Sequence, residues 1–247
     1  ARDQILQPGT YTENMSISAQ PSQAPYLHRL LSPEQFEEVA NITVAFLGLF
    51  LSLIGFAILL SFSTLTRQWQ PIVAASIYGT TLILLFAASV LYHSSLATDL
   101  VHKKAFQIID HCAIFLLIAG SFTPMGLIVL KNHASGFPML GLLWGMALMG
   151  CLHKIFVPMG SNLLSTLAYV GMGWSIVLVY QPLFAGLQQG GTALVVAGGL
   201  FYTLGSVFYL FDHKFRGAHA LWHGFVLAGS LSHYLAILFF VILPALS

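Results

Sequence analysis

The chain has 247 residues, of which 57% are hydrophobic and only 7% are charged. Soluble domains carry about 25% charged residues, so this composition excludes a water-soluble globule and predicts an all-α polytopic membrane protein. Nine Lys and Arg residues against eight Asp and Glu residues leave no strong charge bias, which gives no support to a nucleic-acid partner. Cys112 and Cys151 lie in or at the ends of apolar segments, and we interpret them as small buried side chains.

The N-terminal segment differs in composition from the rest of the chain. Residues 1–31 are polar and lack the apolar run of a secretory signal peptide. We expect them to be disordered or derived from the expression vector, and residues 32–247 to form one transmembrane domain. The sequence Ser32-Pro33-Glu34-Gln35 is typical of a helix start with a capping box. It predicts a short amphipathic helix near the membrane surface before the first span.

Seven apolar segments approach the length of about 20 residues that spans a bilayer. In chain order they are Asn41–Phe62, Ile72–Tyr92, Ile109–Leu130, Pro138–Leu152, Leu163–Leu183, Thr192–Phe211 and His219–Leu243. The fourth is short unless it continues to Val157. Pro124 should kink the third, with Ser or Thr hydroxyls bonding the freed backbone groups. The short connections predict a bundle in which sequential helices are antiparallel neighbours.

The positive charges predict how this bundle is oriented. With seven spans, Arg67 and Lys131 lie on one side of the membrane. The other side carries Arg2, Arg29, Lys103, Lys104, Lys154, Lys214 and Arg216. The positive-inside rule then places the N-terminus in the cytoplasm and the C-terminus outside. We expect a multi-pass protein of the plasma membrane, which is the inner membrane in a bacterium.

Polar side chains from three segments are expected at one depth near the cytoplasmic face. His219 and His223 are four residues apart, the spacing by which one helix face offers two imidazoles to a metal ion. The second segment ends at His93, and the third begins near Asp110. Three imidazoles and an open position fit a catalytic zinc site. Asp110 would bind the metal directly or hold a bound water, and Ser89, on the face of His93, would bond that water or a substrate oxygen. The alternative is a chance group of solvated interfacial histidines.

The spaced motif formed by Ser89-x-x-x-His93, Asp110 and His219-x-x-x-His223 resembles the signature of the progestin and adipoQ receptor family. That family includes adiponectin receptors and the bacterial hemolysin III-related proteins. The resemblance extends from about Glu37 to the end of the chain, and the length favours the hemolysin III branch. In one departure, Val44 follows Thr43 where many hemolysin III members carry a histidine.

The resemblance implies seven transmembrane helices and a cytoplasm-facing zinc ion. It assigns His93, His219 and His223 as zinc ligands, with Asp110 acting through a bound water and Ser89 beside it. It also implies kinship with alkaline ceramidases, and hence a lipid amidase as one outcome.

Our leading functional hypothesis is a zinc-dependent hydrolase that cleaves an amide or ester in a membrane lipid. A ceramide-like N-acyl lipid is the substrate that the kinship suggests. Zinc would supply hydroxide at neutral pH, Asp110 would transfer the proton, and Ser89 would help to stabilise the oxyanion. One alternative is a receptor-like or membrane-homeostasis sensor with structural zinc. Another is a hemolysin-like pore, which the lack of a charged stripe for a hydrated lumen disfavours.

The other histidines are expected outside this site. His111 should point about 100° away from Asp110 around its helix. His233 should lie about 15 Å deeper than His223 and form a hydrogen bond across the bundle. Solvation is the expected role of the histidines in loops or at span ends, which are His102, His133, His153 and His213.

Overall fold

The computed structural model describes residues 32–94, 100–157 and 161–246, and within these ranges every regular element is helical. The α-helices are α1 (Pro33–Leu65), α2 (Trp69–Ser94), α3 (Leu100–Pro124), α4 (Gly136–Phe156), α5 (Asn162–Trp174), α6 (Tyr180–Leu210) and α7 (Ala218–Ile237). Short π- or 3-10 segments follow α3, α5 and α7 (Met125–Val129, Ser175–Val179, Leu238–Ile242 and Leu243–Leu246). The predictions for residues 1–31 lie outside the described residues.

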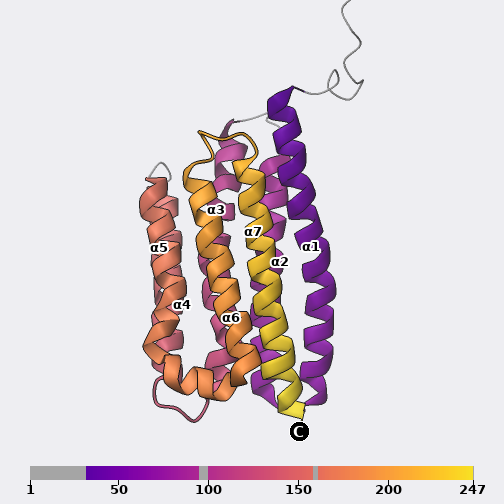
Figure 1. Ribbon diagram of the computed structural model, residues 1–247, viewed down its shortest axis with the longest axis vertical. Coiled ribbons are helices and arrows are strands. Elements are labelled where there is room, and N and C mark those ends of the chain that lie inside the picture. Colours follow the sequence, from indigo (N-terminus) through magenta and orange to yellow (C-terminus); the bar gives the residue numbers. More distant parts are fainter. Residues whose placement is uncertain (1–31, 95–99, 158–160, 247) are drawn as a thin grey trace, which may run out of the picture.

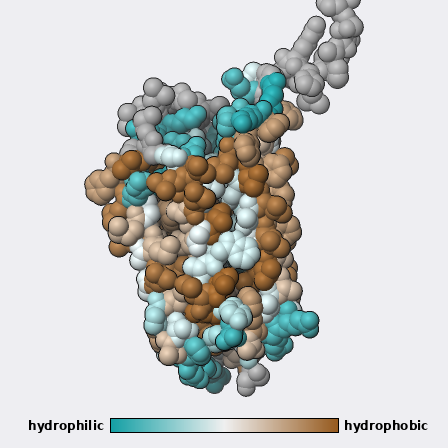
Figure 2. Space-filling view, turned by 60° about the vertical axis from the view of Figure 1, so that its left-hand side comes forward, coloured by the Kyte–Doolittle hydropathy of each residue, from teal (hydrophilic) through white to brown (hydrophobic). Residues whose placement is uncertain are grey.

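The helices lie side by side along the long axis of the molecule (Figure 1). Successive helices α1 to α4 contact one another in order, α6 contacts α7, and α7 returns to contact α1. Six helical stretches in the described residues are long and apolar enough to cross a membrane. On the face shown in Figure 2, hydrophobic side chains predominate in the middle and hydrophilic ones gather toward the two ends. The all-helical membrane architecture is therefore confirmed.

Helix α1 starts as predicted but differs from the prediction in its first turns. The Ser32 hydroxyl accepts a hydrogen bond from the Gln35 amide at 3.2 Å, and the Gln35 side chain accepts one from the Ser32 amide at 2.8 Å, which confirms the capping box. The prediction of a separate short amphipathic helix before the first span is wrong, because α1 continues without interruption to Leu65. No glycine or proline follows Pro33 until Gly48, so nothing in this stretch breaks the helix.

The fourth helix has its longer predicted form, whereas the third begins at Leu100, nine residues before the predicted Ile109. Helix α4 ends at Phe156, so the longer form of the fourth segment is the correct one. At Pro124 the α-helix gives way to the π-helical turn Met125–Val129. The Thr123 hydroxyl donates to the Ala119 carbonyl at 2.9 Å, and the Ser121 hydroxyl donates to Ile118 at 3.0 Å. The carbonyl that loses its partner at Pro124 is that of Gly120, four residues earlier, so these two hydroxyls bond its neighbours and not the freed group itself.

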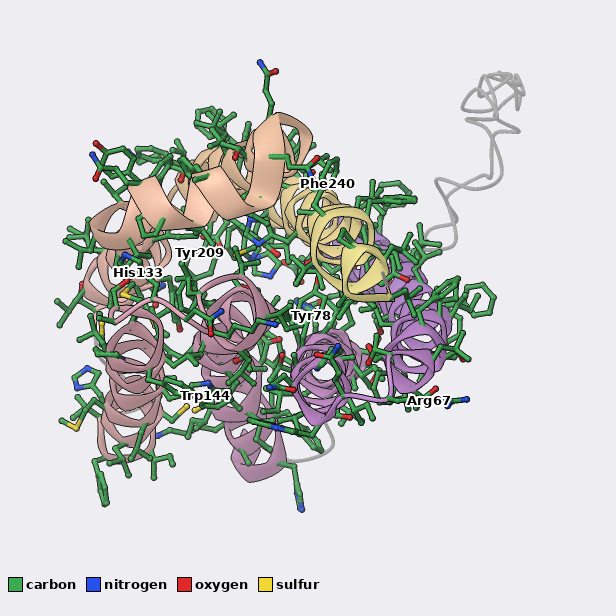
Figure 3. All side chains as sticks on the ribbon, turned by 90° about the horizontal axis from the view of Figure 1, so that it is seen from below. Arg67, Tyr78, His133, Trp144, Tyr209 and Phe240 are labelled. Atoms are coloured by element: carbon green, nitrogen blue, oxygen red, sulfur yellow. The ribbon has the colours of Figure 1, made fainter. Side chains whose placement is uncertain are left out.

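The fifth predicted segment is too long at its C-terminal end. Its α-helix stops at Trp174, a 3-10 turn follows, and Gln188 has the non-helical angles φ 60° and ψ 174°. The Trp174 indole donates to the Thr203 hydroxyl at 2.9 Å. A straight helix would separate these residues by about 43 Å, so the chain reverses between them. The reversing segment lies across the lower end of the bundle (Figures 1 and 3).

An apolar cavity of ≈ 200 Å³ lies among α3, α5, α6 and α7. On α7 its wall extends from Trp222 past Val226 to His233, a distance of about 16 Å at the helical rise. Aromatic side chains from α3 and α5, including Phe122 and Tyr169, complete much of the lining. The wall residue Trp222 directly precedes His223 in the chain, so one end of the cavity lies at the level of the histidine pair of α7, whose rings are not part of the lining.

Candidate metal centre

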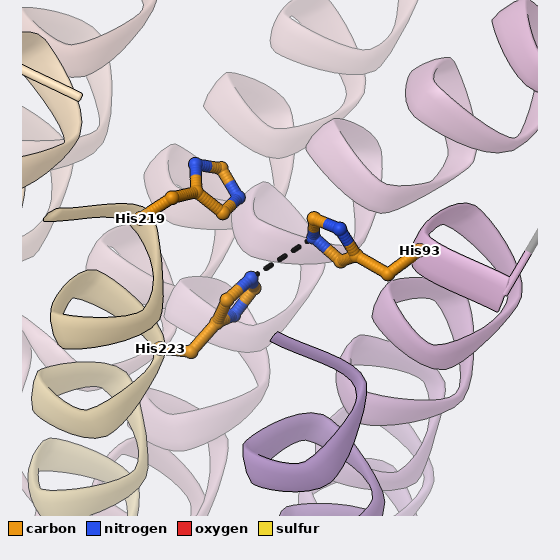
Figure 4. A group of neighbouring side chains, drawn as sticks. All are labelled: His93, His219 and His223. Carbon is orange, nitrogen blue, oxygen red and sulfur yellow. Dashed lines mark hydrogen bonds between the residues drawn. The ribbon is translucent and has the colours of Figure 1, made fainter. Parts of the chain in front are cut away.

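Three histidine side chains meet between the end of α2 and the start of α7. One potential ligand atom from each of His93, His219 and His223 lies within 4.8 Å of the other two. His93 Nε2 is 3.0 Å from His223 Nε2, and the His219 ring lies against both (Figure 4). His93 and His223 are buried, and His219 is about 20% exposed. The structure thus brings together the three predicted ligands in a group that could hold a metal ion.

Two carboxylates contact the far nitrogen of two of these rings. Glu38 Oε2 on α1 is 2.7 Å from His93 Nδ1, and Asp212 Oδ2 is 3.1 Å from His219 Nδ1. Asp212 lies in the turn between α6 and α7, and its hydrogen bond with His219 lowers the pKa of its carboxyl below the usual value. Histidine ligands of metals are commonly held this way, with the second ring nitrogen bonded to a carboxylate.

The geometry suits a tetrahedral ion. With metal–nitrogen bonds of about 2.0–2.1 Å, two ligand nitrogens should be about 3.3 Å apart, close to the 3.0 Å between the Nε2 atoms of His93 and His223. Imidazole ligands suit zinc, copper, iron and nickel. The hydroxyl of Ser89, one turn before His93, is buried and has no hydrogen-bond partner. An unpartnered buried hydroxyl beside the histidines is consistent with a place for a further polar ligand.

Asp110 lies near this group but outside it. Its half-buried carboxyl is within electrostatic range of His219, yet it is not one of the described side chains whose ligand atoms cluster. Of the two roles predicted for Asp110, this position favours contact through a water over direct ligation.

Three of the remaining described histidines make contacts outside this group. His233 Nε2 lies 3.1 Å from the Val195 carbonyl on α6, which confirms the predicted bond across the bundle. His111 Nε2 is 3.3 Å from the Tyr209 hydroxyl, and the His133 ring contacts Ser135.

The prediction from sequence missed Glu38 and Asp212. Both lie outside the apolar segments that define the predicted spans, Glu38 in the polar first turns of α1 and Asp212 seven residues before His219. The one feature that could have pointed to them is that each is an acidic residue in a segment predicted at the same membrane face as the histidines. The sequence alone did not show which acidic residue would reach which ring.

Most of the chain matches one known protein family. A family model described as "Haemolysin-III related" matches residues 34–234. The chain belongs to the haemolysin-III-related family. It is 38% identical over 215 residues to the Hemolysin-3 homolog of Bacillus subtilis (strain 168), covering 85% of this chain and 98% of that protein. It is 37% identical over 206 residues to Hemolysin-3 of Bacillus cereus, covering 83% and 92%.

A human relative shows the wider reach of the family. The monocyte to macrophage differentiation factor of Homo sapiens is 33% identical over 215 residues, covering 83% of this chain and 84% of that protein. The resemblance inferred from the spaced motif is therefore confirmed. Together with its six apolar helical stretches, membership of the haemolysin-III-related family makes this chain a multi-pass protein of the plasma membrane, the bacterial inner membrane.

Proposed function

We propose that this haemolysin-III-related protein is a zinc-dependent hydrolase that cleaves an amide or ester bond of a membrane lipid. The observation that carries the proposal is the convergence of His93, His219 and His223 beside an apolar cavity. Three imidazoles with a free fourth position are typical of catalytic zinc sites, whereas structural sites use four protein ligands. Among the described residues, the cluster contains no fourth protein ligand.

The surrounding side chains suit hydrolysis. Zinc bound at such a site polarises a carbonyl oxygen and lowers the pKa of water to about 7. Asp110, close to His219 but not in the ligand group, would accept the proton of the attacking water and pass it to the leaving amine or alcohol. The unpartnered Ser89 hydroxyl would donate a hydrogen bond to the substrate oxygen as negative charge develops on it.

The apolar cavity supports a lipid as the substrate. Apolar side chains dominate its wall from Trp222 to the middle of α7, so it suits a hydrocarbon chain rather than a charged solute. A ceramide-like lipid would place its acyl chain there and its amide at the histidines. The same lining argues against the pore, because a conducting path needs polar or charged side chains along its length.

A zinc-dependent assay on purified protein tests this function. The protein is stripped with a chelator, reloaded with zinc and incubated with N-acyl sphingolipids and glycerolipid esters, and released fatty acid is measured. We expect release only after zinc is restored, and none from His223→Ala. Zinc binding without cleavage of any amide or ester would contradict the hydrolase and support the sensor with structural zinc.

We also propose seven membrane crossings, with the N-terminus in the cytoplasm and the C-terminus outside. The start of α1 and the end of the described chain lie at opposite ends of the bundle, as an odd number of crossings requires (Figure 1). Of the described Lys and Arg residues, five lie toward the end with the histidines and only Arg67 and Lys131 toward the other end, which favours a cytoplasmic location for the histidine end.

Reporter fusions test this orientation. Alkaline phosphatase, which is active only outside the cytoplasm, is expected to be active when fused after Leu246. Green fluorescent protein at the same position should remain dark. The opposite pair of signals would show an even number of crossings or the reverse orientation.

A further inference from the structure

Hydrogen bonds to two carboxylates determine which ring nitrogen of His93 and of His219 is available to bind a metal ion. A carboxylate accepts hydrogen bonds and donates none. The 2.7 Å contact from Glu38 Oε2 therefore requires the proton of His93 on Nδ1, and the 3.1 Å contact from Asp212 Oδ2 requires the same for His219. In a neutral imidazole, Nε2 then carries the lone pair.

The freed nitrogen of His93 faces the third histidine. His93 Nε2 lies 3.0 Å from His223 Nε2, and the His219 ring centroid lies 4.8 Å from that of His223. We infer that Glu38 and Asp212 are positioning residues, which hold His93 and His219 in the tautomer and orientation that present Nε2 to one metal ion. The inference rests on the proposed metal centre and extends it to two residues beyond the predicted ligand set.

Glu38 also connects the metal centre to α1. Its neighbour Glu37 accepts a hydrogen bond from the backbone amide of Gly217, the N-cap of α7, at 3.2 Å. The first turns of α1 thus contact both the end of α2 and the start of α7, the two elements that carry the histidines. Further along α1, Asn41 and Ala45 are buried in the bundle, while large side chains such as Phe46 and Phe50 are exposed.

This connection couples the metal to the position of α1. A contact that favours metal binding is itself favoured by the bound metal, since the coupling free energy is the same in both directions. Bound zinc should therefore strengthen the Glu38–His93 hydrogen bond and slow local opening of the first turns of α1. Loss of a carboxylate partner of this kind typically lowers metal affinity by about 10–100-fold.

Chelator-competition titrations with zinc test the inference on the purified full chain. Glu38→Ala and Asp212→Ala are each expected to weaken zinc binding by about 10–100-fold. The matched control is Glu34→Ala, which removes the same charge one turn earlier from an exposed position on α1 and should leave the affinity unchanged. Asp212 lies in the turn between α6 and α7, outside the helices, so Asp212→Ala should fold even if Glu38→Ala does not. The inference can then still be tested with Asp212→Ala alone.

Hydrogen exchange gives a second readout that is independent of activity. Zinc should slow amide exchange in the first turns of α1 in the unaltered protein and in Glu34→Ala, but not in Glu38→Ala. Both carboxylate variants binding zinc as tightly as the control would overturn the positioning role while leaving the metal centre intact. An unaltered protein that binds no zinc would overturn the metal centre and this inference together.

Discussion

Alanine in place of His219 is expected to reduce the zinc content of the purified protein from about one ion per chain to almost none. His219 supplies one of three converging nitrogens, and two imidazoles leave half of a tetrahedral shell to water. The loss of affinity should exceed the roughly 10–100-fold that follows loss of an outer partner. Elemental analysis of the protein after gel filtration measures the effect directly.

The matched control for this substitution is His153→Ala. His153 is exposed near the end of α4, on the side of the bundle where the three histidines meet. It should retain a full equivalent of zinc. Equal zinc contents in the two variants would show that the metal binds elsewhere or only nonspecifically.

Asparagine in place of Asp110 is expected to lower turnover by about 10²–10⁴-fold, the usual contribution of a general base. The amide has nearly the same shape but cannot accept the proton from water. Because Asp110 is not in the ligand group, the variant should keep its zinc. Turnover and zinc content are measured on the same sample.

The two readouts separate the roles open to Asp110. A slow variant with full zinc supports proton transfer. Loss of zinc together with activity would instead make Asp110 a direct ligand, and an unchanged rate would exclude it from the chemistry.

The membrane helices and the three histidines could be predicted from the sequence because each depends on local pattern. The apolar segments have the length of a bilayer span. The spacing of His219 and His223 places them on one helix face whatever surrounds the helix. The depth of His93 followed from its place at the end of the second segment, opposite the start of the seventh.

What could not be predicted depends on contacts between distant parts of the chain. Glu38 reaches His93 only because the first turns of α1 lie against α2. The helix end at Trp174 has no proline to mark it, and the break falls at Gln188 itself, a residue of good helix propensity, rather than at Gly186 or Gly190 two residues away. The reversal brings α5 against α6, where the Trp174 indole donates to the Thr203 hydroxyl, a contact between distant residues that no local pattern predicts.

The most direct test is X-ray absorption at the zinc edge, measured on the purified unaltered protein. Three histidine nitrogens and one water oxygen at about 2.0–2.1 Å are the predicted first shell. A shell dominated by sulfur at about 2.3 Å, a shell of oxygens without the imidazole signature, or a preparation that takes up no zinc would contradict a metal centre built from His93, His219 and His223.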